Sequence, residues 1–513
     1  MIRAFDKDAD RVVVIGAGIA GLATAVRLVS AGARVTLLER HAHLGGKIRT
    51  TPSDAGPVDA GPTVLTMRHV FDDLFASAGA ALDDHVTLVP QHILARHFWP
   101  DGSQLDLLAD RGATIDAISG FAGSRAAQDF DKFCDRAEKL FNAFDLPMMQ
   151  SPEPKLSALV RHVMQNPSLI GAMSPLSTLA GVLHRQFGDL RLQQLFGRYA
   201  TYVGGAPHLS PAVLALIWHA EAQGVWVVKG GMHKLAQALA RLATNLGVEI
   251  VNNAHVEEVL MRANRVQSVR LIDGTSFPAD VVVFAGDPRA LATGELGPNL
   301  EHVASPTRSQ PRSFSARVHS FAARVSGPDL AHHNVFFSDQ INSEFADLMD
   351  QRIPEDPTLY LCAEDRGYPT RQAGLERFEI IANAPATQTT SRPKDLDQWH
   401  QKILTRLTRF GVHFSPKPDP TTVTCPQNFA DLFPASMGAL YGQSPHGLMA
   451  AFKRPTARTP IQGLYLCGGG THPGAGVPMA TLSARHAVEA ILKDRTSTSR
   501  SAQTAMHGGM STA

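Results

Sequence analysis

The pattern that most constrains this chain is a glycine fingerprint directly after its first apolar run. Residues 12–15 are four branched aliphatic residues in a row, which is typical of a buried parallel strand. Gly16, Gly18 and Gly21 follow as G-x-G-x-x-G, and apolar residues then recur at helical spacing. Gly16 permits the tight turn, Gly18 lets a pyrophosphate approach the backbone, and Gly21 lets the helix pack on the strand. The segment therefore predicts a dinucleotide-binding βαβ unit.

A second apolar strand, residues 34–38, ends at the acidic residue Glu39, which lies eighteen residues after Gly21. This spacing is close to the roughly 20 residues expected of such a unit. A carboxylate at this position accepts hydrogen bonds from ribose hydroxyls, and it disfavours NADP because it repels a 2′-phosphate. Three glycines alone could mark an ordinary loop. The strand, the helix and the acid around them favour nucleotide binding, with the phosphates at the helix N-terminus.

A second glycine-rich motif lies near the C-terminal end of the chain. The apolar run 464–467 precedes Gly468-Gly469-Gly470, and another glycine-rich loop leads into a helix predicted over 481–492. Successive backbone N–H groups in such a loop form a nest that suits the ribityl and pyrophosphate part of a flavin. Because this order of strand, glycines and helix repeats that of the N-terminal fingerprint, we expect one cofactor site made from both ends of the chain.

Several stretches carry a resemblance to a known family. They are Glu39-Arg40 with Gly45-Gly46-Lys47, Asp59-Ala60-Gly61-Pro62-Thr63-Val64-Leu65, and Gly468-x-Gly470-Thr471-His472-Pro473-Gly474-Ala475-Gly476. Together they resemble the flavoprotein superfamily of amine oxidases and carotenoid desaturases, and most closely its bacterial-type phytoene desaturases. Within that family, the stretch 196–205 and the run Gly230-Gly231-Met232-His233 are most similar to the 3,4-desaturases of hydroxylated or methoxylated carotenoids of purple bacteria.

The resemblance implies FAD as the cofactor. In the superfamily the residue at Val256 packs by the adenine, and the glycine pair carries backbone beside the FAD. The predicted cofactor-binding residues are Gly16, Gly18, Ala20, Gly21, Glu39, Arg40, Gly45, Gly46, Lys47, Gly61, Pro62, Thr63, Val256, Gly468, Gly469, Val477, Pro478 and Met479. No catalytic residue is assigned. His472 is the nearest candidate for a proton acceptor, and a structural role for it in the loop is at least as well supported.

The implied fold class is α/β, with a Rossmann-like FAD-binding domain and an interleaved α+β substrate domain. At 513 residues the chain exceeds one ordinary core. The predicted division is a discontinuous FAD-binding domain of residues 1–85, 225–290 and 455–495, a substrate and membrane-contact domain of residues 86–224 and 291–454, and a disordered tail of residues 496–513. Elsewhere we expect a hairpin at Asp101-Gly102, a solvated helix over 112–145, an antiparallel meander within 248–285, and strands at 318–321, 359–362 and 378–382.

Charge and cysteine content exclude several classes of function. The formal net charge of +1 indicates no affinity for nucleic acid. The four cysteines show no C-x-x-C spacing, so we predict neither a disulfide framework nor a metal site, and they fit a reducing compartment. No apolar signal precedes the first strand, and no run of about 18 residues is apolar enough to span a bilayer. We therefore expect a cytoplasmic protein.

Residues 151–200 favour contact with a membrane surface. From residue 163 to residue 184 there is no Asp, Glu, Lys or Arg, but prolines and serines make the run a poor membrane span. Basic residues stand at its margins: Lys155, Arg161, Arg185, Arg191 and Arg198. The alternative is that these helices form the core of a substrate domain. Because the implied substrate is a lipid, we expect peripheral association with the inner or intracytoplasmic membrane.

The resemblance implies an oxidoreductase that introduces C-3,4 double bonds into 1-hydroxy- or methoxy-carotenoids of the hydroxyneurosporene type, in a spheroidene- or spirilloxanthin-type pathway. FAD would remove a hydride equivalent from an allylic carbon while a proton leaves the neighbouring carbon. An apolar tunnel that includes residues 196–228 would hold the polyene. The alternatives are a phytoene desaturase, a flavin amine oxidase and a non-catalytic carotenoid- or FAD-binding protein. The electron acceptor, dioxygen or a quinone, stays open.

Overall fold

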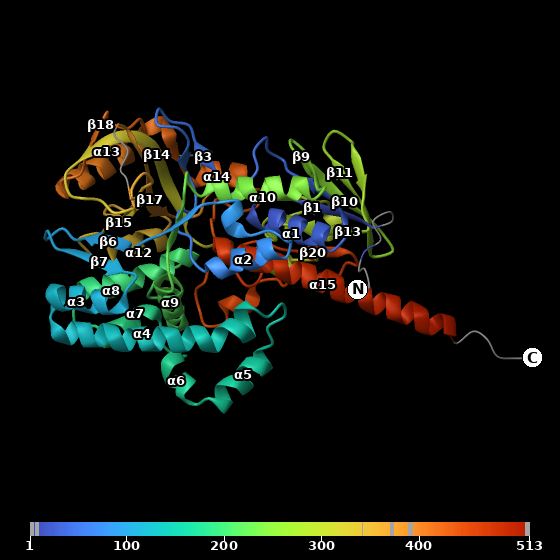
Figure 1. The fold of residues 1–513 in the computed structure, drawn as a ribbon, viewed down its shortest axis with the longest axis horizontal. Helices are drawn as coiled ribbons and strands as arrows, with labels where there is room; N and C mark the ends of the chain where they lie inside the picture. Colours follow the sequence, from blue (N-terminus) through green and yellow to red (C-terminus); the bar gives the residue numbers. More distant parts are fainter. Residues whose placement is uncertain (1–4, 6–9, 341, 370–373, 388–392, 508–513) are drawn as a thin grey trace, which may run out of the picture.

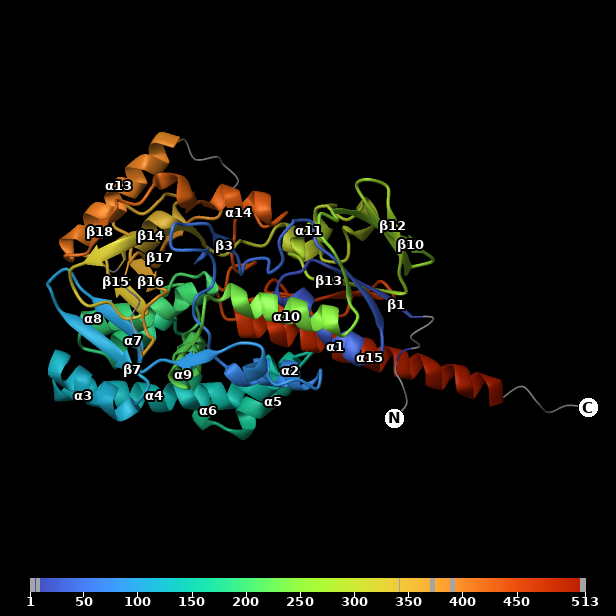
Figure 2. The same ribbon diagram turned by 45° about the horizontal axis from the view of Figure 1, so that its top comes forward.

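Two sheets of different kinds organise the molecule. The structure, a computed structural model, describes residues 5, 10–340, 342–369, 374–387 and 393–507. In Figure 1 a parallel sheet with its helices fills one half, and a larger mixed sheet with its own helices fills the other. The turned view in Figure 2 shows that the first and last helices of the chain, α1 (Ile19–Ser30) and α15 (Val477–His507), lie side by side in the same half.

The parallel sheet joins segments that are far apart in the sequence. Its strands, in spatial order, are β20 (Leu464–Leu466), β13 (Val281–Phe284), β1 (Arg11–Ile15), β2 (Arg34–Leu38) and β9 (Glu249–Val251). The register sets Val14 between Leu37 on one side and Val283 on the other, and Val283 pairs in turn with Tyr465. All these strands fall within the three segments predicted for the FAD-binding domain.

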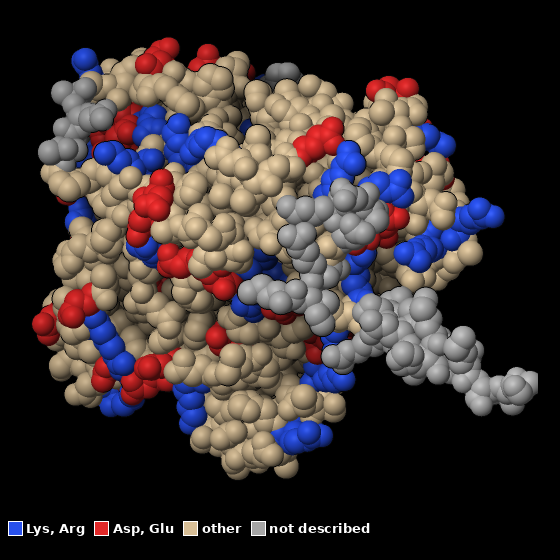
Figure 3. Space-filling model, turned by 45° about the vertical axis from the view of Figure 1, so that its right-hand side comes forward, with Lys and Arg blue, Asp and Glu red and all other residues tan. Residues whose placement is uncertain are grey.

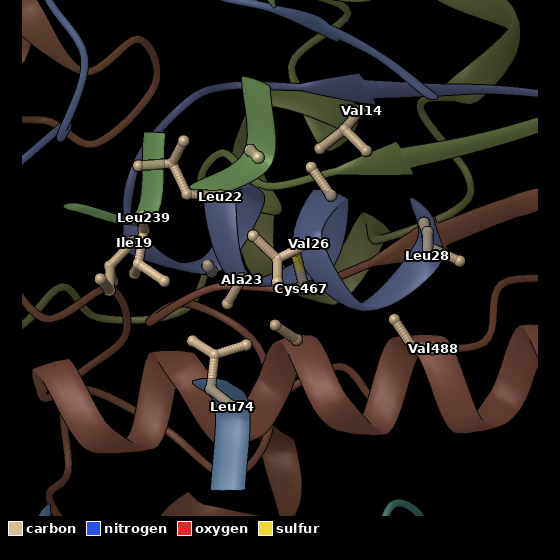
Figure 4. Packing of buried hydrophobic residues seen from close by; sticks show 14 of the residues in the cluster. Val14, Ile19, Leu22, Ala23, Val26, Leu28, Leu74, Leu239, Cys467 and Val488 are labelled. Carbon is tan, nitrogen blue, oxygen red and sulfur yellow. The ribbon is translucent and has the colours of Figure 1, made fainter. Parts of the chain in front are cut away.

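Side-chain alternation along β1 explains why both faces of this sheet are covered. Val12 and Val14 pack toward α1, α10 (His233–Asn245) and α15, and Figure 4 shows α1 packed between Val14 and Val488 of α15. Val13 and Ile15 pack on the opposite side, in the cluster that holds the antiparallel meander. The meander consists of β10 (Val256–Arg262), β11 (Arg265–Leu271) and β12 (Ser276–Pro278). Each fully buried aliphatic side chain contributes about 1.5–3 kcal/mol to folding.

The larger sheet is mixed. In spatial order its main path is β18 (His413–Ser415), β14 (Ser315–Ser326), β17 (Glu376–Ala384), β16 (Leu359–Ala363), β15 (His333–Phe336), β6 (Ile93–Phe98) and β7 (Gln104–Leu108), and β19 (Val423–Thr424) also pairs with β14. One face packs on α13 (Pro393–Arg409) through Phe336, Phe378 and Ile403. On the other face Val335 packs into the hydrophobic core formed by the helices between residues 111 and 222.

Those inserted helices form a layer below the larger sheet in Figure 1. They are α3 (Arg111–Ala122), α4 (Ser124–Phe144), α5 (Leu156–Gln165), α6 (Ser168–Met173), α7 (Leu179–Gln186), α8 (Leu190–Gly197), the 3₁₀ helix η3 (Arg198–Val203) and α9 (Leu216–Ala222). The remaining helices are α2 (Arg68–Ala76), α11 (Arg289–Ala292), α12 (Ser343–Met349) and α14 (Pro426–Leu432). Two short ribbons, β3 (Thr50–Thr51) with β4 (Val58–Asp59) and β5 (Leu88–Pro90) with β8 (Trp226–Val228), connect the halves.

The structure confirms the predicted hairpin, the meander and the three strands of the larger sheet. The solvated helix predicted over 112–145 is wrong. Two helices separated at Gly123 occupy that segment, and α4 buries one full side. Phe130, Phe133 and Leu140 recur at helical spacing between its charged residues, and most of the charges lie on the outer face, while Asp129 is buried.

The helix α15 is assigned as far as His507, within the tail of residues 496–513 that is predicted to be disordered, and the disorder of this tail stays a prediction. Residues 508–513 lie outside the part of the chain that the structure describes.

Candidate cofactor and substrate site

A cavity of about 1300 Å³ lies at the carboxyl ends of the parallel strands and continues beneath the larger sheet. This volume exceeds the roughly 300–1,000 Å³ of ordinary ligand pockets, so it has room for a dinucleotide and a long substrate together. All the residues predicted to hold the cofactor border the cavity except Gly21. The two glycine motifs, from opposite ends of the chain, therefore face one space.

Gly21 supports the site from behind. A Cβ atom placed on Gly21 would lie 1.9 Å from the carbonyl oxygen of Gly16, so only glycine lets α1 approach the turn after β1. Gly16 itself has a φ of +99°, and its N–H donates to the Leu38 carbonyl at 2.8 Å. The N-cap of α1, Gly18, has no side-chain cap, which leaves the first N–H groups of the helix available to phosphate.

Glu39 holds this glycine turn in place at the end of β2. Its Oε2 accepts the Ala17 N–H at 2.8 Å, and its Oε1 accepts the His41 N–H at 2.9 Å. The side chain is 5% exposed and borders the cavity, as does Val256 on the neighbouring meander. Each carboxylate oxygen has a second lone pair, so the predicted hydrogen bonds to ribose hydroxyls are compatible with both contacts.

The loop after Glu39 contacts the turn that contains Gly16 and Gly18. The N–H of Gly45 donates to the Ala17 carbonyl at 2.9 Å, which joins this loop to the N-terminal turn. Gly61 packs against the same loop, because a Cβ there would lie 2.0 Å from the Lys47 carbonyl oxygen. These contacts set Gly45-Gly46-Lys47 and Gly61-Pro62-Thr63 next to each other along the cavity wall.

The C-terminal motif closes the opposite wall. The N–H of Gly468 donates to the Ser483 hydroxyl at 3.1 Å, and Nη1 of Arg454 donates to the Gly469 carbonyl at 2.8 Å. The helix α15 begins at Val477 and points its N-terminal end at the cavity, with Val477, Pro478 and Met479 in the lining. Two helix N-termini and three glycine loops around one space fit FAD, whose pyrophosphate is anionic and whose ring system is large and flat.

His472 has a structural role in this loop. Its Nε2 lies 3.0 Å from the Met148 carbonyl oxygen and 2.9 Å from that of Ser151, and its ring stacks on His486 at 5.7 Å. Burial lowers the pKa of His472, so the ring is neutral at pH 7. The contacts tie the cofactor loop to the segment between α4 and α5. Of the two roles considered for His472, this arrangement favours the structural one.

The substrate part of the cavity is largely apolar. Its lining includes Leu159, Val163, Met173, Leu183, Leu214, Ile217, Val335, Phe337 and Ile381. A hydrogen-bonded chain crosses it near the predicted cofactor contact Thr63, whose hydroxyl lies 2.6 Å from that of Tyr360. The Tyr360 hydroxyl lies 2.7 Å from Nδ1 of His333. Burial raises the pKa of Tyr360 and lowers that of His333, so both groups are neutral.

A buried cluster behind His333 was not indicated by the spacing of the cysteines. His332, His333 and Cys362 place ligand-type atoms within 4.8 Å of one another. The pair His332 Nε2 and Cys362 Sγ lies at 3.4 Å, and Nδ1 of His332 lies 2.8 Å from the Arg366 carbonyl oxygen. Hydrogen bonds within the protein thus engage both ring nitrogens of His332.

Sequence reasoning missed a polar group in the apolar part of the cavity. Arg198, predicted at a membrane margin, is instead buried in η3 and borders the cavity with Tyr202 and Glu221. Its Nη1 donates to the Tyr202 hydroxyl at 2.9 Å. The prediction was wrong because exposure was judged from local composition, while the partners of Arg198 come from the next turn and from α9. Only the clustering of Arg, Tyr and Tyr within 198–202 could have indicated it.

Comparison with known proteins decides the family. The sequence profile described as flavin containing amine oxidoreductase matches residues 19–492. The chain belongs to this family. It is also 53% identical to the hydroxyneurosporene desaturase of Cereibacter sphaeroides, over 96% of this chain and 99% of that protein. It is 46% identical to the hydroxyneurosporene desaturase of Rhodobacter capsulatus, over 95% of this chain and 99% of that protein.

A solved structure shows the same fold at much lower identity. Cyclohexylamine oxidase from Brevibacterium oxydans superposes with a TM-score of 0.59 over 94% of this chain and 99% of that one, at 18% identity. This likeness concerns the fold alone. It confirms the predicted α/β class. The flavin-containing family to which the chain belongs supports FAD as the cofactor.

The contact between Gly21 and Gly16 yields a first prediction. Gly21→Ala should weaken FAD binding at least about tenfold, because the new methyl group forces α1 away from the turn and moves its N–H groups from the phosphates. Gly120→Ala on α3 is the matched control, since a Cβ there meets nothing within 4 Å. Titration of deflavinated protein with FAD, followed by flavin fluorescence, measures both. Equal affinity of Gly21→Ala and the control would contradict the role given to Gly21.

Lys47 yields a pH-dependent prediction. Its Nζ donates to the Leu440 carbonyl in the cavity wall, and burial lowers the pKa of Lys47 to about 8. The ammonium is therefore charged below pH 8 and neutral above it, and only the charged form attracts the anionic cofactor. We expect the Kd for FAD to rise about fivefold between pH 7 and pH 9, which corresponds to ~1 kcal/mol. In Lys47→Met the Kd should stay constant over this range. A variant that keeps the wild-type pH dependence would rule out Lys47 as its source.

Proposed function

We propose that the protein is an FAD-dependent carotenoid desaturase that forms the C-3,4 double bond of 1-hydroxy- or 1-methoxy-carotenoids in carotenoid biosynthesis. The observation that carries the proposal is the single cavity, which has a glycine-lined cofactor end and a long apolar end. The two relatives described above, both named hydroxyneurosporene desaturase and both matched over almost their whole length, support the substrate class.

The reaction assigns separate tasks to cofactor and chain. FAD, when bound, supplies the hydride-accepting chemistry. The chain holds it through the backbone at Gly18, Gly45 and Gly468, and the apolar walls hold the polyene and exclude water. A positive charge that forms next to a conjugated polyene is delocalised, so a weak proton acceptor suffices. No residue is assigned that role.

Anaerobic mixing of FAD-loaded protein with 1-hydroxyneurosporene tests the proposal. The flavin absorbance near 450 nm should bleach, and a polyene absorbing at longer wavelength should appear, because the new double bond extends the conjugation. Bleaching by phytoene but not by the hydroxylated substrate would favour a phytoene desaturase. Peroxide release from amines would favour an amine oxidase, and pigment returned unchanged would favour a non-catalytic carrier.

We infer further that α5 and α6 rest on a membrane surface. Within the described residues no helix combines the length and the apolar character that a membrane span needs. The lobe of α5 and α6 exposes large apolar side chains instead, including Met164 at 67% and Leu176 at 100%. In Figure 3 this lobe, at the bottom of the view, is mostly free of charge and carries basic groups at its edges. Such a surface suits the plane of a bilayer with anionic headgroups.

The same lobe forms the mouth of the cavity. Leu156, Val160, Met164 and Ile170 are exposed and also border the cavity. Of the five basic residues predicted for the margin, Lys155, Arg161 and Arg185 are exposed. Arg191 is only partly exposed and pairs with Asp189, and Arg198 is buried. A carotenoid dissolved in the bilayer would thus reach the cavity without passing through water. Dioxygen or a quinone remains the proposed electron acceptor.

Charge placed on this lobe should weaken membrane binding. The double variant Val160→Glu and Met164→Glu should lower the fraction bound to anionic vesicles at least about tenfold, because burial of one such side chain is worth about 1.5–3 kcal/mol. Ile272→Glu, at a position 65% exposed beside the meander, is the control that keeps binding. Flotation with liposomes measures the bound fraction of each variant, at equal FAD content. If the double variant floats as well as the wild-type protein, α5 is not part of the membrane-contact surface.

A further inference from the structure

Arg198 is a buried cation whose donor groups are only partly used. Nη1 donates to the Tyr202 hydroxyl at 2.9 Å, whereas Nε and Nη2 have no hydrogen-bond partner. The residue is 9% exposed and borders the cavity. The guanidinium packs over the rings of Tyr199 and Tyr202 at 5.4 and 5.0 Å, and its Nε and Nη2 are enclosed by the protein. Unpaired donors on a buried charged group are unfavourable, so an acceptor that reaches them from the cavity would be bound favourably.

The neighbours of Arg198 hydrogen-bond to one another. Glu221 on α9 accepts the Tyr199 hydroxyl at its Oε1 and the Tyr202 hydroxyl at its Oε2, both at 2.8 Å. Burial raises the pKa of both tyrosines, so each phenol keeps the proton that it donates. Each oxygen of this carboxylate thus accepts a hydrogen bond, whereas two donor groups of the Arg198 guanidinium have no partner.

The cluster packs near the hydrogen-bonded chain that begins at Thr63. Tyr202 and Tyr360 pack against the same hydrophobic core, as does Val64, which follows Thr63 in the sequence. Nδ1 of His333 lies 2.7 Å from the Tyr360 hydroxyl, which lies 2.6 Å from the Thr63 hydroxyl. Because Thr63 is a predicted FAD contact, this chain of neighbours leads from the cofactor wall to Arg198.

We propose that Arg198 donates hydrogen bonds to the oxygen on C1 of the carotenoid and so determines substrate specificity. This inference rests on the proposed function. C1, which carries the oxygen, is separated from C3, where the double bond forms, by C2 alone, so the group that binds the oxygen must lie close to the cofactor. A guanidinium can only donate, and it therefore accommodates a hydroxyl and a methoxyl oxygen alike. A hydrocarbon end would leave its donors unpaired and be rejected.

Three polyenes in vesicles distinguish this role from a structural one: 1-hydroxyneurosporene, its 1-methoxy ether, and neurosporene, which has no oxygen. For FAD-loaded wild-type protein, kcat/KM should be higher for both oxygenated substrates than for neurosporene. In Arg198→Met this preference should fall about 10- to 100-fold, as expected for loss of a hydrogen bond from a charged donor. Arg198→Lys should keep part of it. Arg125→Met, which removes an exposed arginine of α4 with an i,i+4 partner, should keep all of it.

The ratio of substrates is decisive because a misfolded site lowers all three rates together. A wild-type ratio in Arg198→Met overturns the proposal, and so does a wild-type protein that rejects the ether as it rejects neurosporene. If Arg198→Met does not retain FAD, Arg198→Lys decides, and a wild-type ratio there overturns the proposal. Failure of wild-type protein to oxidise any of the three polyenes is a different result, which refutes the proposed function itself.

Discussion

The parallel pairing of β13 with strands from opposite ends of the chain is the constraint on which the rest of the structure depends. Val283 pairs with Val14 of β1 on one side and with Tyr465 of β20 on the other. Both β1 and β20 lead directly into a glycine loop and a helix. Their pairing with β13 therefore fixes the distance between the two glycine motifs, which together form the cofactor cradle. The packing of α1 on α15 then holds both helix N-termini toward the same cavity.

Much of this arrangement could be predicted from the sequence because its determinants are local. A run of branched aliphatics, glycines at fixed offsets and Glu39 after the second strand each follow from the needs of a short segment. The predicted cofactor residues accordingly border the cavity. Gly21 is the exception. It lets α1 pack closely against the turn after β1, and it contacts that turn on the side away from the cavity.

The substrate end could not be predicted in the same way, because its parts meet only in three dimensions. Arg198 and Glu221 stand on separate helices, and Tyr360 comes from a strand of the larger sheet. Composition placed Arg198 at the surface, yet tertiary contacts bury it. The amphipathic side of α4 was missed for a related reason, because the charge content of a segment does not show what packs against it.

The arrangement of β20 has a consequence for biosynthesis of the protein. This strand begins at residue 464 of 513, so a ribosome has polymerised about nine-tenths of the chain before the second half of the cradle exists. The side of the nascent α1 that packs on α15 stays uncovered until then, as does the edge of β13 that pairs with β20. Cofactor loading is therefore a late step, and scarcity of flavin during synthesis would leave a chain that is exposed to aggregation and proteolysis.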